Sequence, residues 1–275
     1  MDPAEARTLI VEDVQEVLGQ VAGGLPVVRL SAELERASQD FQAIAICHLL
    51  ERLDSEAFRI NLLRSVHARR YFLLRCRQQG NTADRRLALS RTEALFDALA
   101  AGHDSTLQSL IQHSIVRHVP GWEYEDDFIY MRWIQELATG APADALEATA
   151  RQRRQALGRP PDARQAALLA LSAGDRPALS IALHALAAEL DEHAQQQLAG
   201  SLEPDLDTCL LWPRSFVSVE LLALLALANR RGLVMDEPFP MCLTQGRLPR
   251  GGADTEDFFA GIERVRANDA GSIAS

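Results

Sequence analysis

The chain has 275 residues and a mass of 30.3 kDa, enough for one large domain or two small ones with a substantial core. Hydrophobic residues make up 47% of it and charged residues 24%, an ordinary globular balance that excludes wholesale disorder. The formal net charge of −10 gives a surface that repels phosphate backbones, which argues against nucleic-acid binding and suits a basic partner.

The sequence shows no sign of export or membrane insertion. Its first residues, MDPAEARTLIVEDV, lack the basic-then-apolar pattern of a signal peptide, and the longest apolar run, LLALLALA at 221–228, is too short to span a membrane. Cys47, Cys76, Cys209 and Cys242 are widely spaced and form no C-x-x-C pair, which predicts reduced core thiols. We therefore expect a cytoplasmic protein.

The first half of the chain repeats with helical period and is rich in Ala, Leu, Arg, Glu and Gln, which are strong helix formers. Asp2 as cap and Pro3 in the first turn mark the start of the first helix. PVVRL, residues 26–30, is the one short candidate strand. We predict helices at about 3–22, 31–53, 55–79, 82–101 and 104–118.

The second half continues the same pattern, with glycines at the expected helix ends. Further helices are predicted at about 123–139, 142–157, 161–173, 177–199 and 215–231, the last capped by Ser215 or Ser218. Helices joined by short turns pack as antiparallel neighbours, so we predict an all-α, helical-repeat-like bundle of antiparallel helix pairs. The expected single domain covers 1–245, with N-terminal helices in 1–118 and a core in 119–245. Residues 246–275 form a polar, Gly-rich tail with a candidate short helix.

The stretch GWEYEDDFIYMRWI, residues 121–134, sets four acids among aromatic residues in a chain with few aromatics. On a helical wheel its apolar residues form one wide face, and Asp126 and Asp127 fall on that face near the start of the helix. We therefore expect these two acids to be held inside the protein. Glu123 and Glu125 are better placed to reach a partner.

Three interpretations of the acids stay open. In the first, they interact with the helix dipole and the free backbone N–H groups of the first turn. In the second, Asp126 or Asp127 forms a buried structural ion pair, because a guanidinium binds a carboxylate through two hydrogen bonds; the arginine candidates are Arg69, Arg70 and Arg75. In the third, the stretch docks a basic partner. The candidate partner-binding residues are then Trp122, Glu123, Tyr124, Glu125, Asp126 and Asp127.

Motifs for catalysis and metal binding are absent from the sequence. It contains no lysine, which excludes a G-x-x-x-x-G-K-[ST] phosphate-binding loop, and it has no G-x-S-x-G or H-E-x-x-H motif. The Glu-x-x-His pairs of di-metal helical bundles are missing too. We predict no catalytic residue, metal or cofactor, and keep a metal-dependent helical hydrolase that uses the acidic cluster as the weaker alternative.

The acidic stretch resembles the YEDDF-x-Y helix of the immunity 49 family of bacterial polymorphic-toxin immunity proteins. SFVSVELLALLALANRRGLVM, residues 215–235, is similar to the C-terminal apolar helix of that family and is followed by a Pro-containing loop, EPFPMC. ARQAALLALSAGDRPALSIALHALAAEL, residues 163–190, is similar in its order of a helix, a Gly-Asp turn and a longer helix. The resemblance covers roughly residues 110–243, and the preceding part matches only in being helical.

The resemblance implies a soluble all-α protein, without catalysis of its own, that binds a cognate toxin domain and blocks its active site. The toxin is expected to be encoded next to it and to be secreted, for example by type VI secretion. An acidic protein suits such a partner, because complementary charge steers a basic toxin toward it. The alternative from the residues is a helical-repeat scaffold or regulator that binds a peptide in a groove.

Overall fold

The computed structural model describes residues 2–142, 145–146, 148–151, 161–200, 206–247, 257 and 259–262. All regular secondary structure in these ranges is helical, which confirms the predicted all-α fold. Two isolated β-bridges, Pro120 with Glu123 and Phe239 with Cys242, hold turns and build no sheet within the described residues.

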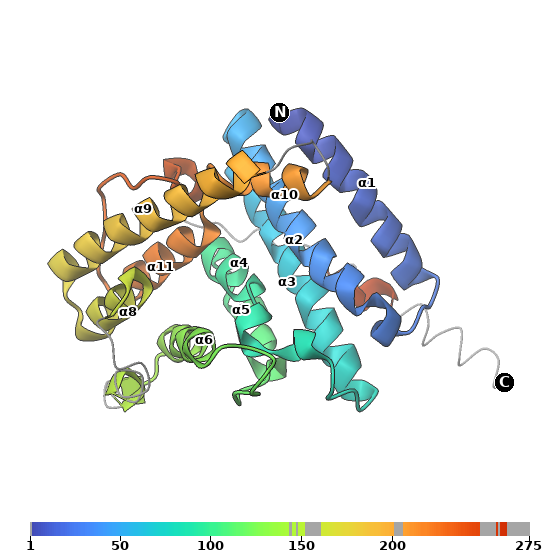
Figure 1. Cartoon of the computed structure of the whole chain (residues 1–275), viewed down its shortest axis with the longest axis horizontal. Coiled ribbons are helices and arrows are strands. Elements are labelled where there is room, and N and C mark those ends of the chain that lie inside the picture. The colour runs from blue at the N-terminus through green and yellow to red at the C-terminus, as the bar shows by residue number, and fades with distance from the viewer. Residues whose placement is uncertain are drawn as a thin grey trace.

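Three long helices form one side of the molecule (Figure 1): α1 (Pro3–Ala22), α2 (Val27–Arg52) and α3 (Ser55–Gln78). Short connections make them antiparallel neighbours, with α2 packed against both others. Two of them begin at aspartate caps, because the side chain of Asp2 accepts the N–H of Ala4 and that of Asp54 accepts the N–H of Ala57. Their facing apolar residues form most of the core on this side.

The candidate strand at residues 26–30 is wrong, because α2 begins at Val27 and includes this segment. Pro26 has φ −60° and lies at the N-cap, where a fixed φ and a missing N–H suit a helix start. Leu30 then packs into the core from the first turn. The two β-branched valines favour a strand less strongly than the proline before them favours the start of a helix.

The single helix predicted at 82–101 is also wrong, since the chain there forms η1 (Arg85–Leu87), η2 (Leu89–Arg91) and α4 (Ala94–Ala101). The break has a visible cause. Ala88 has φ −51° and ψ 142°, outside the helical region, so the helix cannot continue through it. Its carbonyl accepts the backbone N–H of Arg91 and a donor of the buried Arg69 guanidinium, which also donates to the Thr92 hydroxyl.

The second side of the molecule contains α6 (Glu125–Ala138), α8 (Ala163–Ala173), α9 (Arg176–Gly200) and α11 (Val219–Arg230). Of the two predicted caps for the last helix, Ser218 is the one used, and it accepts the N–H of Leu221. The central residues of α11 are buried, and α11 packs on α4. Short helices α4 and α5 (Asp104–His113) lie between the two sides (Figure 1).

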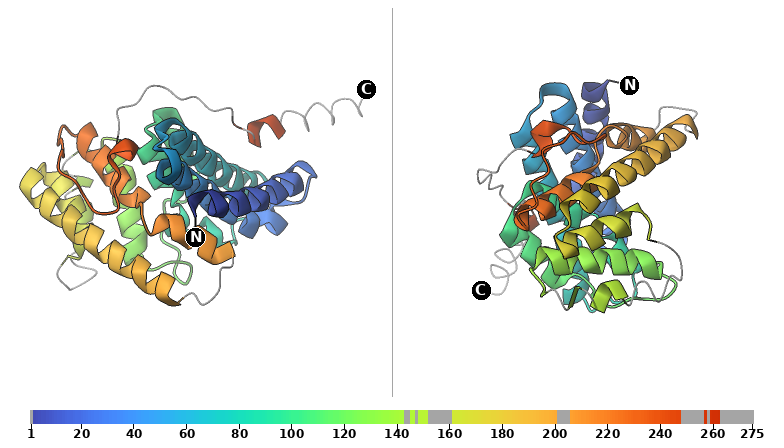
Figure 2. Two further views of the ribbon diagram at one scale, coloured as in Figure 1. Left: turned by 90° about the horizontal axis from the view of Figure 1, so that it is seen from above. Right: turned by 90° about the vertical axis from the view of Figure 1, so that its left-hand side faces the viewer.

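A short helix that the sequence did not predict, α10 (Leu206–Arg214), joins the two sides. It packs against α1, α2 and α9, and Figure 2 shows it between the two groups of helices. The stretch Cys209–Arg230 is apolar enough, at a mean hydropathy of 1.6, to pass as a membrane span by composition. It is divided between α10 and α11 and is mostly buried inside the protein, as expected of core helices.

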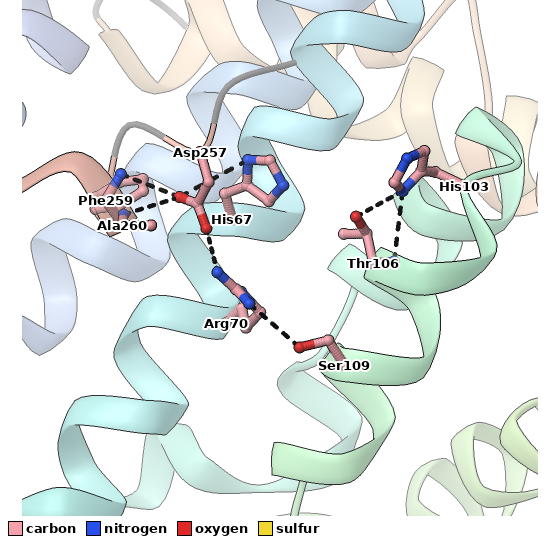
Figure 3. Close-up of polar contacts among 8 residues, drawn as sticks. All are labelled: His67, Arg70, His103, Thr106, Ser109, Asp257, Phe259 and Ala260. Atoms are coloured by element: carbon pink, nitrogen blue, oxygen red, sulfur yellow. Dashed lines mark hydrogen bonds and ion pairs between the residues drawn. The ribbon is translucent and has the colours of Figure 1, made fainter. Parts of the chain in front are cut away.

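Residues 257 and 259–262 of the tail lie against α3 (Figure 3). Asp257 forms an ion pair with Arg70 and caps the turn at 259–262 by accepting the N–H groups of Phe259 and Ala260. The Phe259 ring stacks on Tyr71 with ring centroids 5.0 Å apart and is buried. The described part of the tail is therefore anchored to the three-helix side through α3.

Candidate functional site: a cleft between the two helix groups

A cleft of about 690 Å³ separates the two groups of helices. Its walls come from α2, α3, the start of α4, the loop before α6, and parts of α9, α10 and α11. This volume is within the range of pockets that hold a small molecule or the side chains of an inserted segment. Five carboxylates and four guanidinium groups are among the residues that line the cleft.

The acidic stretch contributes to one edge of this cleft. We call this edge the cleft rim and define it by the lining residues Glu93, Trp122, Glu123, Tyr124 and Asp127. Of the six residues predicted to bind a partner, Glu125 and Asp126 are not among those that line the cleft. The structure thus brings most of the predicted residues to one concave surface.

The expectation that Asp126 and Asp127 are held inside is wrong. Asp127 is exposed and Asp126 is half-buried, since α6 begins only at Glu125 and both acids lie in its first turn. The buried face of the helix starts later, at Ile129. A helical wheel gives angular position alone, and it cannot show that the first turn extends past the packed core.

The arginines proposed to hold these acids bind other residues in the fold. Arg70 pairs with Asp257, Arg75 donates to the side chain of Gln78, and Arg69 donates to Ala88 and Thr92. The first-turn position of the acids favours the helix-dipole interpretation, because their charge lies beside the free N–H groups of α6.

Glu123 was expected to be free to reach a partner, and it is half-buried with a structural contact. Its Oε2 accepts the backbone N–H of Ser90 at 2.8 Å, which fixes the loop before α6 on η2. Oε1 has no hydrogen-bond partner among the described residues. Gly121, at φ +84°, makes the turn that presents Trp122 and Tyr124, a conformation that glycine adopts without strain. Tyr124 is 79% exposed.

The cleft lining also holds an ion pair that sequence analysis missed. Arg164 from α8 binds Glu220 from α11 through two hydrogen bonds of 2.7 Å, and the Tyr130 hydroxyl donates to the same carboxylate at 2.7 Å. Burial lowers the pKa of Arg164, but the Glu220 carboxylate outweighs it and raises that pKa above its ordinary value. The three residues are far apart in sequence, so only the fold reveals the cluster.

We define the cleft floor as Ser38, Gln42, Arg69 and Ala94, which are four of the buried lining residues. Three of these four are polar. Arg69 is 2% exposed, and burial lowers its pKa to about 10. Its Nη2 has two partners, whereas Nε and Nη1 have none among the described residues. Such a buried guanidinium with two unused donors is uncommon, because desolvation of a charge normally requires full pairing.

A buried carboxyl group lies directly beneath this floor. Asp97 of α4 accepts hydrogen bonds from Gln42 Nε2 at 2.6 Å and from Ser65 Oγ at 2.5 Å. Burial raises the pKa of Asp97 to about 7, although both hydrogen bonds oppose the shift. Within the described residues no group of three or more His, Cys, Asp or Glu side chains is arranged to hold a metal ion.

Comparison with known proteins connects this fold to a family. The family model described as Immunity protein 49 matches residues 45–242, which is more than half of the 275 residues. No curated protein and no solved structure gives a significant match. The match takes in α3, α4 and α5, which the sequence motifs alone did not link to the family, together with Arg69, the acidic stretch and Glu220. The chain belongs to the immunity protein 49 family.

Proposed function

We propose that this protein protects the cell that produces it by binding a cognate toxin domain at the cleft and covering the toxin's active site. The observation that carries the proposal is the cleft rim, where an exposed tyrosine and a half-buried tryptophan stand beside carboxylates inside the family-matched range. Aromatic residues flanked by charge are the usual energetic centre of a protein interface.

The charges of the molecule support a basic partner. The net charge of −10 attracts a basic domain over a distance, and the rim acids Glu93, Glu123 and Asp127 supply a local negative potential at the point of contact. Neutralisation by binding needs no chemistry from the immunity protein itself, so we infer that it is not an enzyme. We propose that the protein acts in the cytoplasm, where it binds the toxin before or after the toxin reaches its target.

Co-expression with the toxin encoded by the neighbouring gene tests the proposal. Cells that carry both genes are expected to survive induction of the toxin, and the two proteins are expected to co-purify as a stable complex. The control is the same toxin with the empty vector, which kills. Death in the presence of the protein, together with no complex on purification, would overturn the proposed function.

A further inference from the structure

We propose that a proton shared by Asp13 and Asp40 holds α10 closed against α1 and α2, so that α10 opens as this proton is lost and one wall of the cleft changes. The inference concerns the fold and does not depend on the proposed function. It assigns a role to a buried pair of acids that does not line the cleft.

The attachment of α10 to the three-helix side is a small apolar cluster, separate from the main core. Among the described residues, α10 contributes Cys209 and Leu210 to it, and α1 and α2 contribute Ile10, Val14, Phe41, Ala43 and Ile44. A helix held by few buried apolar contacts opens locally at a smaller cost than the whole fold. The end of α10 supplies Leu211, Arg214 and Ser215 to the cleft lining, so its opening removes part of that wall.

Two acids lie side by side at this joint. Asp40 of α2 is fully buried and is hydrogen-bonded to the side chain of Asp13 of α1. Two carboxylates repel each other and neither has a hydrogen to donate, so this contact requires a proton on one of them. Asp40 carries it, because Arg36 forms an ion pair with Asp13 at 2.7 Å, whereas neither oxygen of Asp40 accepts an N–H or O–H of the described residues.

The charges that act on Asp40 come from the elements packed around it. Asp13 belongs to α1, Arg36 to α2 itself and Arg214 to α10. The Arg214 guanidinium is held at the joint, where it donates to the backbone carbonyl of Gln39 at 3.3 Å. Burial is the largest cause that raises the pKa of Asp40 to about 8. Asp13 raises this pKa further, and the two arginines lower it by less.

A third acid, Asp97 of α4, also feels the charge of Arg214. Its carboxyl oxygens accept from Gln42 of α2 and Ser65 of α3, so its partners belong to the three-helix side and not to α10. Opening of α10 leaves these hydrogen bonds in place. Asp97 is therefore exposed to water by unfolding of the whole molecule, whereas Asp40 is exposed by the opening of α10.

The direction of the pH effect follows from burial. When α10 opens, water reaches Asp40, and the pKa of this group falls below its value of about 8 in the closed state. Loss of Arg214 acts in the opposite direction and is the smaller effect. Between the open and closed pKa values only the closed state keeps the proton. The opening equilibrium therefore rises with pH, by up to about tenfold per pH unit, and levels off above the closed pKa.

Hydrogen exchange of the α10 amides from about pH 6 to about pH 9, corrected for the intrinsic base-catalysed rate, measures this opening. The amides of α11, a buried helix, report unfolding of the whole molecule. In the wild type we expect the α10 amides to be less protected than those of α11 by about tenfold or more, with protection falling until about pH 8. In Asp40→Asn, whose amide donates to Asp13 without a titrating proton, the α10 protection should not depend on pH.

The matched control is Glu12→Gln, which removes an exposed carboxylate next to Asp13 on α1 and should leave the wild-type pH dependence of α10. Equal protection of α10 and α11 would show that α10 opens only with the whole fold, which overturns the proposal. A wild-type pH dependence in Asp40→Asn would overturn the role of the shared proton. If Asp40→Asn does not fold, Asp13→Asn decides: it should move the midpoint below about pH 8, and an unchanged midpoint overturns the proposal.

Discussion

Asp97 lies fully inside the molecule, where Gln42 and Ser65 donate hydrogen bonds to its two oxygens. Burial raises its pKa from 3.8 to about 7. Below pH of about 4 the carboxyl group is protonated in both folded and unfolded chains. From about 4 to about 7 the folded chain alone keeps the proton, so stability falls as pH rises and the loss is complete above the folded pKa.

We predict that the free energy of unfolding decreases between about pH 4 and about pH 7, with a contribution from Asp97 on the order of 4 kcal/mol. Asp97→Asn should reduce the slope of this dependence, because an amide carries no titrating proton. Urea unfolding at several pH values measures the effect. Asp40, whose pKa burial raises to about 8, should supply the slope that remains in the variant. The exposed Asp191→Asn is the control, and an unchanged slope in Asp97→Asn would contradict the prediction.

At the scale of single residues, the sequence showed which residues were unusual but not what they do. The aromatic and acidic composition of residues 121–134 drew attention to the rim, and most of the predicted partner-binding residues do line the cleft. Burial was misjudged for Asp127, because a wheel has no information on where the packed core ends along the axis. Arg69 was proposed as a partner for those acids, whereas its surroundings come from η2 and the turn before α4.

At the scale of elements, Glu220 is the point where three helices meet. Its carboxylate accepts from Arg164 of α8 and from Tyr130 of α6 while it belongs to the first turn of α11. Guanidinium stacking over the Tyr130 ring, at 5.5 Å from the ring centroid, adds to the contact. This cluster fixes the orientation of α6 and hence the position of the rim beside the cleft.

Glu220→Gln is therefore expected to destabilise the fold by about 2 kcal/mol, because the charge-assisted hydrogen bonds from Arg164 become weaker and one acceptor oxygen is lost. Thermal unfolding measures the change. Asp104→Asn is the matched control, since Asp104 pairs with Arg230 at the surface and the loss of an exposed pair costs at most about 1 kcal/mol. Equal melting temperatures for Glu220→Gln and wild type would show that the cluster does not hold the helices.

Element prediction from sequence succeeded where caps and periodicity agreed and failed where tertiary contacts intervened. Asp2 and Pro3 gave the start of α1, and the glycine after α8 gave its end. The break within 82–101 lies at Ala88, which has a non-helical backbone and contacts Arg69 from another helix, and no local pattern records that contact. The helix predicted at 104–118 ends earlier, at His113. The sequence did not predict α10, because a helix of nine residues is too short to show a clear helical period. Part of the helix predicted at 142–157 lies outside the described residues.

At the scale of the whole molecule, two groups of helices meet across α4 and α10 and leave a charged cleft between them. The cleft could not be predicted from sequence, because its walls are drawn from segments spread from residue 35 to residue 241. The fold class could be predicted from sequence, since strong helix formers and helical period extend over most of the chain. The family likewise followed from local motifs, and the match now extends it to residues 45–242.

The most direct test of the proposed cleft interface is the Kd of the purified complex between an inactive toxin domain and Tyr124→Ala. Tyr124 is 79% exposed, so its removal should leave folding unchanged. The control is Ile181→Ala on α9, a comparably exposed residue at 73% that does not line the cleft. We predict that Tyr124→Ala weakens binding by about tenfold or more while Ile181→Ala has no effect. Unchanged binding by Tyr124→Ala, or a larger loss with Ile181→Ala, would contradict a toxin interface at the cleft rim.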